Sequence, residues 1–211
     1  LIGSTLIGEK LRDGLTLNGT DVYKTGDLKY NYSDDYRGDI ITDDDGNIFV
    51  ATTTRSSSLP VVNGIQNDNN GLLDGYLFEL NPDCSQMLWG TYLGGTEQDA
   101  FYSIKLDNFN HIIVGGGTGS SDLNIGDSTY AAVNAGDIDG VIALFDKSEK
   151  SLLRATYWGT DKYDQIYFID TDQQGRIYAS GQTEGSVTKT PDAYGESGKG
   201  QFIFRLDSSL N

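Results

Sequence analysis

The chain of 211 residues carries 15 Lys or Arg against 31 Asp or Glu, which gives a formal net charge of −16. This length suffices for one large domain, or for two small ones, with a proper hydrophobic core. So negative a field repels phosphate backbones, and no apolar run reaches the length of a membrane span. The sequence therefore argues against nucleic-acid binding and against membrane insertion. The single cysteine, Cys84, excludes an internal disulfide.

The N-terminal part divides into two predicted segments. Residues 1–13 resemble a strand segment found later in the chain, around Thr91. We expect them to form the last strand of a preceding sheet, or to complete the last sheet of the chain. Residues 14–34 match nothing else in the chain and are predicted to be an inserted hairpin or loop.

The rest of the chain consists of three similar units, at residues 35–98, 99–163 and 164–211. Each unit predicts short strands that are rich in β-branched and aromatic residues and are separated by turns containing Gly or Asn. The first predicted strand of each unit ends near Ile41, Leu106 and Thr171, respectively. The following strands are predicted at 47–53, 76–80 and 87–94 in the first unit, at 111–117, 141–145 and 152–159 in the second, and at 176–182 and 202–206 in the third, which lacks its fourth strand. No stretch has the periodicity of a long amphipathic helix.

The units repeat with a regular period, because Asp43, Asp107 and Asp172 correspond at spacings of 64 and 65 residues. A β-sandwich does not need so regular a period, and a β-solenoid normally repeats over fewer residues. Four antiparallel strands repeated radially are typical of a β-propeller, so we predict an all-β propeller with three four-stranded blades visible. Since propellers commonly have about four to eight blades, these three are expected to be part of a larger ring.

The acidic stretch 43–47 could be a calcium loop or a hairpin turn. Asp43 and Asp45 alternate as calcium ligands do, but no bidentate acid follows at the spacing of an EF-hand. In the corresponding turns of the other units only the leading Asp and the Gly or Asn position, here Gly46, persist. A hairpin requires an Asp that accepts backbone N–H bonds and a residue that tolerates positive φ, so we predict a turn.

Asp35, Asp99 and Asp164 recur at the junctions between units. They are predicted to accept hydrogen bonds from neighbouring backbone amides. The alternative is a cation, such as structural calcium, held between blades. Apart from that possibility, the sequence indicates no cofactor.

Other residue types that often carry chemistry lack suitable partners in the sequence. His111 follows a predicted turn without further metal ligands around it, and Cys84 lies in a turn without a nearby base. Trp89 and Trp158 align with non-aromatic residues, which indicates variable sheet-face positions rather than a stacking platform. The Gly-rich run 116–121 lacks the lysine and the helix of a phosphate loop. We therefore predict no catalytic, cofactor-binding or metal-ligating residue, and no enzyme.

The stretch WGTYLGGTEQDAFYSIKLDNFNHIIVGGGTGSSD, residues 89–122, resembles the SBBP-type β-propeller repeat. DGLTLNGTD at 13–21 and GQFIFRLDSSLN at 200–211 are similar to one subgroup of large secreted proteins of gliding Gram-negative bacteria. In that subgroup a propeller precedes further modules and a C-terminal signal for type IX secretion. The resemblance covers almost the whole chain. It implies an extracellular or cell-surface propeller segment, flanked by other modules of the same polypeptide, and it brings no catalytic residues.

Three polar loops between the second and third strands, at 55–73, 119–138 and 185–199, are the predicted recognition surface for a glycan or protein ligand, unless they merely cover the blade edges. We expect a non-enzymatic module for adhesion, ligand recognition or rigid scaffolding. One alternative is a propeller hydrolase or lyase that acts on polysaccharides, with catalytic acids at the central channel. Another is a structural subunit of an extracellular filament.

Overall fold

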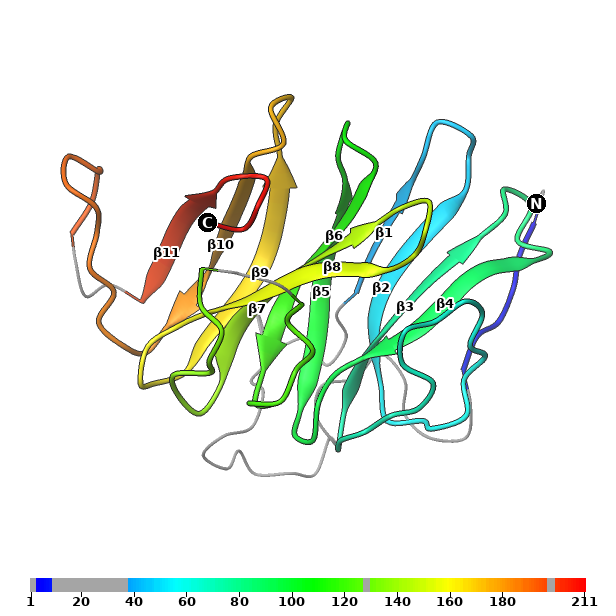
Figure 1. The fold of residues 1–211 in the computed structure, drawn as a ribbon, viewed down its shortest axis with the longest axis horizontal. Coiled ribbons are helices and arrows are strands. Elements are labelled where there is room, and N and C mark those ends of the chain that lie inside the picture. The colour runs from blue at the N-terminus through cyan, green and yellow to red at the C-terminus, as the bar shows by residue number, and fades with distance from the viewer. Residues whose placement is uncertain (1–2, 9–37, 127–129, 197–199) are drawn as a thin grey trace.

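The computed structural model describes residues 3–8, 38–126, 130–196 and 200–211, and within these ranges it contains strands and no helix (Figure 1). The predicted insertion at 14–34 and the junction residue Asp35 lie outside the described residues. The strands are β1 Asp39–Thr42, β2 Ile48–Thr54, β3 Asp74–Leu80 and β4 Met87–Leu93 in the first unit; β5 Asp99–Leu106, β6 His111–Thr118, β7 Asp139–Asp146 and β8 Leu152–Trp158 in the second; and β9 Asp164–Thr171, β10 Ile177–Thr183 and β11 Gln201–Leu206 in the third.

Each unit folds into one antiparallel sheet in which neighbours along the chain are neighbours in space. Two sheets have four strands, β1 to β4 and β5 to β8, and the third has three, β9 to β11. The strands predicted for the three units are thus all confirmed to within a few residues. An alternating or continuous apolar pattern bounded by Asp, Gly and Asn predicts such strands well.

The sheets lie side by side, with β5 to β8 between the other two, in a propeller-like arrangement (Figure 1). The first strands β1, β5 and β9 are the inner strands, and β5 and β9 each contact the first three strands of the preceding sheet, whereas β4, β8 and β11 are the outer strands. The described strands form an open fan and do not close into a ring.

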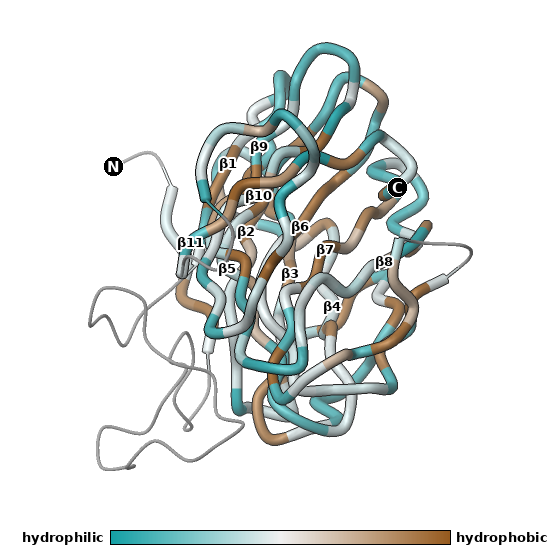
Figure 2. The backbone as a smooth tube through the Cα atoms, turned by 90° about the vertical axis from the view of Figure 1, so that its left-hand side faces the viewer, coloured by the Kyte–Doolittle hydropathy of each residue, from teal (hydrophilic) through white to brown (hydrophobic). Residues whose placement is uncertain are grey.

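The hydrophobic core has one layer on each face of the middle sheet, and two further buried clusters complete it. Phe49, Trp89 and Phe145 belong to the layer between the first and second sheets, and Ile142 and Ile166 belong to the layer between the second and third. Because both faces of the middle sheet are covered, β6 is buried over almost its whole length. The hydrophobic stretches follow the strands, and the turns at one end of the sheets are hydrophilic (Figure 2).

Both tryptophans contact aromatic residues of other strands. The Trp89 ring meets the Phe145 ring edge-on at a centroid distance of 5.6 Å, which joins β4 to β7 of the next sheet. The Trp158 ring lies 3.9 Å from that of Phe202 and 4.8 Å from that of Phe204, both on β11. These side chains therefore bind the sheets together, and they are not free to stack on a ligand.

Residues 3–8 pair with no strand of the described chain. Ile7 packs against a cluster on the first sheet that contains Tyr76, Phe78 and Tyr92. The segment lies beside the first sheet, on the opposite side of the molecule from β11 (Figure 1). That residues 1–13 form a strand of another sheet stays a prediction.

Candidate functional site

The acidic turn at 43–47 is a hairpin turn, as predicted. The Asp43 carboxylate accepts the backbone N–H groups of Asp45 and Asn47, at 3.1 and 2.8 Å, and Gly46 has a φ of 81°. The second carboxylate oxygen pairs with Lys147 Nζ at 2.9 Å. Because both oxygens are occupied by the turn and by a lysine of the next sheet, Asp43 has a structural role.

The equivalent turns in the other units repeat this bonding. Asp107 accepts the N–H of His111 at 2.9 Å, and Asp172 accepts that of Arg176 at 3.1 Å. Although desolvation opposes it, hydrogen bonding to Arg176 lowers the pKa of Asp172 to about 2. The ring of His111 bonds Asp107 at 2.8 Å, so the histidine reinforces the turn. Cys84 has a φ of 59° in the β3–β4 turn and is a free, half-buried thiol.

The first two predicted recognition loops cover the outer strands of their sheets. Val62 exchanges backbone hydrogen bonds with Gly90 of β4, and the Leu59 N–H donates to the hydroxyl of Tyr92. In the second unit the Leu123 N–H donates in the same way to the hydroxyl of Tyr157. Unpaired edge strands invite association, so covering them is a function in itself.

The three predicted loops nevertheless present apolar side chains to solvent. The exposed residues are Leu72, Tyr130, Val133 and Tyr194. A ligand-binding role of the loops stays a prediction beside their role as edge covers.

Two pairs of aspartates meet where one sheet passes to the next. Short parallel bridges join Leu73 to Gln98 and Ile138 to Tyr163. Each of these four residues is followed in the sequence by an aspartate. Asp74 therefore lies beside Asp99, and Asp139 beside Asp164; all four are fully buried. Asp99 and Asp164 were expected at junctions and accept backbone amides there, from Gly95 at 2.7 Å and from Thr160 at 2.5 Å.

Sequence reasoning missed the partners Asp74 and Asp139. The available signal was the Asp-Gly pair that opens the third strand of the first two units. Burial raises the pKa of Asp74 and of Asp139 to about 6, and the neighbouring carboxylates of Asp99 and Asp164 add to the effect. We call these two sets the first junction (Asp74 and Asp99) and the second junction (Asp139 and Asp164).

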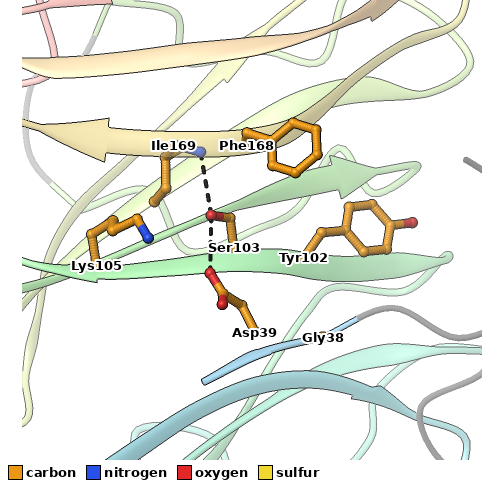
Figure 3. A pocket seen from close by; sticks show the side chains of 7 residues that line it. All are labelled: Gly38, Asp39, Tyr102, Ser103, Lys105, Phe168 and Ile169. Atoms are coloured by element: carbon orange, nitrogen blue, oxygen red, sulfur yellow. Dashed lines mark hydrogen bonds between the residues drawn. The ribbon is translucent and has the colours of Figure 1, made fainter. Parts of the chain in front are cut away.

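A groove of about 570 Å³ opens along the inner strands β1, β5 and β9 (Figure 3). Its lining residues are Gly38, Asp39, Tyr102, Ser103, Lys105, Phe168 and Ile169. Ser103 lies at its centre, where its hydroxyl donates to Asp39 Oδ2 at 3.3 Å and accepts the Ile169 N–H at 3.2 Å. Phe168 projects beside it and is 51% exposed. Aromatic surface with a few convergent polar groups is typical of a small-ligand site.

The comparisons with known proteins give no family assignment. No protein-family model matches the chain, and the search of curated proteins finds no match either. Among the described residues, no group of three or more His, Cys, Asp or Glu gathers as a metal site. The same ranges hold no helix that could span a membrane.

Proposed function

We propose that the chain is a segment of a larger β-propeller that serves as a non-enzymatic binding module of a secreted bacterial surface protein, with its ligand, a glycan, in the inner-strand groove. The observation that carries the proposal is the exposed ring of Phe168 beside the polar groups of Asp39 and Lys105. An aromatic face buries the apolar side of a ligand, and the flanking charges bond its polar groups. Glycans combine both surfaces. Adhesion or recognition at the cell surface follows from such binding.

The lining of the groove favours binding over hydrolysis. Glycosidases commonly use two carboxyl groups, one as acid and one as base or nucleophile. Of the described lining residues only Asp39 is acidic, and its carboxylate already accepts the N–H groups of Ile40 and Ile104, at 2.9 and 3.1 Å. The polysaccharide hydrolase is therefore the weaker alternative.

A larger ring is supported by the turn after β11. Asp207 accepts the N–H groups of Ser209 and Asn211, at 2.8 and 3.0 Å, and Leu210 has a φ of 58°. This is the bonding of the Asp43 hairpin, so the chain reverses there and points back along β11. A fourth strand beside β11 would then complete the third sheet.

The surface location and the secretion by a type IX route rest on the resemblance of residues 89–122 to SBBP-type repeats. The net charge of −16 suits a protein that stays soluble at a crowded surface. We also propose that other modules of the same polypeptide flank the propeller and that it takes part in adhesion of gliding cells. The alternative is a structural subunit of an extracellular filament.

A glycan array probed with the purified chain tests the binding proposal. Once a glycan is found, Phe168→Ala is expected to weaken its binding at least about fivefold, because loss of an aromatic stacking partner costs about 1 kcal/mol or more. The matched control is Phe109→Ala, since Phe109 is 52% exposed but lies in the β5–β6 turn. Equal loss of binding in both variants, or turnover of the glycan that depends on Asp39, would contradict the proposal.

A further inference from the structure

The two aspartate junctions have the same backbone arrangement but differ in the side chains around the aspartates. Gln66 in the first and Ala131 in the second are equivalent, because each carbonyl accepts the N–H of the equivalent tyrosine, Tyr92 at 3.2 Å and Tyr157 at 3.1 Å. Each also donates its own N–H to the preceding threonine of β4 or β8. The chain therefore offers an internal comparison of the same site with and without an amide side chain.

The first junction is largely satisfied by donors of its own. Asp99 accepts the hydroxyls of Thr118 and Ser120 and the N–H of Gly95. Gln66 donates its amide to Asp74 Oδ2 at 2.7 Å and accepts the Gly94 N–H at 3.0 Å. Only one carboxylate oxygen, Asp74 Oδ1, is buried without a partner.

The second junction leaves two buried oxygens without a partner. Asp139 Oδ2 accepts the Ala135 N–H at 2.6 Å, and Asp164 Oδ2 accepts the N–H and hydroxyl of Thr160, but the Oδ1 atoms of both aspartates have no hydrogen bond. Ala131 has no side-chain amide that could donate to the junction as that of Gln66 does in the first. Both side chains are fully buried, and both carboxylates lie against Gly159, where any side chain would collide with them.

Two adjacent buried carboxylates are unfavourable unless something neutralises them. Among the described residues, no Lys, Arg or His forms an ion pair with Asp139 or Asp164. We propose that the second junction binds one calcium ion between the second and third sheets, with Asp139 Oδ1 and Asp164 Oδ1 as ligands.

Calcium fits this junction better than other ions. The available ligands are carboxylate oxygens, which hard cations prefer, and calcium accepts irregular geometries that magnesium does not. His111 and Cys84 lie at the opposite, turn end of the sheets, so no nitrogen or sulfur ligand for a transition metal is at hand. The ion would link β7 of one sheet to β9 of the next and so stabilise their packing.

Thermal unfolding of the whole chain with calcium or EDTA tests the proposal. Extracellular calcium modules bind with Kd values of about 0.1–1 mM, so about 10 mM calcium is expected to raise Tm by about 3–10 °C. Asp139→Asn and Asp164→Asn should abolish the rise. Asp161→Asn should keep it, because that side chain is 82% exposed and lies outside the junction.

Ala131→Gln provides a second variant that leaves both aspartates in place. It installs the amide of the first junction and is expected to reduce the calcium-dependent rise, while the Tm in EDTA stays the same or increases. Calorimetric titration should give one calcium per chain for the unmodified protein. No rise with calcium, an equal rise with magnesium, or an unchanged rise in Asp139→Asn would overturn the proposal. Phe168→Ala should leave the rise intact, which separates this site from the groove.

Discussion

Trp89→Ala is expected to lower the free energy of unfolding by about 3–5 kcal/mol, the range for truncating a large buried aromatic side chain. Trp89 is fully buried between the first and second sheets, where it meets Phe145 edge-on and Phe49 packs in the same cluster. The Lys150 ammonium lies 5.7 Å from its ring centroid and would lose that contact as well. The resulting cavity would lie at the interface that holds two sheets together.

Urea unfolding followed by circular dichroism measures this loss. Tyr194→Ala is the control, because Tyr194 is fully exposed and its removal should change stability by less than about 0.5 kcal/mol. A cost for Trp89→Ala below about 1 kcal/mol would mean that the interface between these sheets is not packed as described.

The buried carboxyl of Asp74 is expected to make the fold less stable as the pH rises from about 4 to about 6. Burial first, and then the neighbouring Asp99, raise its pKa from 3.8 to about 6. In this window the folded chain therefore holds a proton that the unfolded chain has released, so stability falls with rising pH. The full difference corresponds to about 3 kcal/mol.

Asp74→Asn removes this titration and should weaken the dependence of the unfolding free energy on pH. The measurement is the difference in unfolding free energy between Asp74→Asn and the unmodified chain at several pH values from 4 to 7. The variant should gain relative stability as the pH rises, whereas Asp161→Asn, at an exposed side chain, should run parallel to the unmodified protein. Parallel curves for Asp74→Asn would show that its carboxyl is not shifted.

The strands and the turns could be predicted because their signals are local. Asp43, Gly46 and their equivalents recur at a fixed period, and a hairpin needs little more than an Asp acceptor and a residue with positive φ. The pairing of the first strand with the second, and of the third with the fourth, follows from the short turns between them, which make these strands antiparallel neighbours.

The groove and the pairing of the junction aspartates could not be predicted because they depend on how the sheets stack. Ser103 bonds Asp39, which lies 64 residues earlier, and Gln165 bonds the hydroxyl of Tyr102, 63 residues earlier. No local pattern reveals such contacts. Asp74 precedes the strand predicted at 76–80, and only the bridge between Leu73 and Gln98 brings it to Asp99. Of the two roles left open for the loops, edge covering is seen in the first two, but which tyrosines anchor them depends on the same packing.

We propose that these sheets are radial blades of one larger propeller. An experimental structure of the complete gene product tests it most directly. We expect a strand paired antiparallel with β11 and further four-stranded sheets that bring the outer faces of the first and third sheets into one ring around the groove. A structure in which β11 remains a free edge, or in which these sheets pack as two opposed layers, would contradict the account.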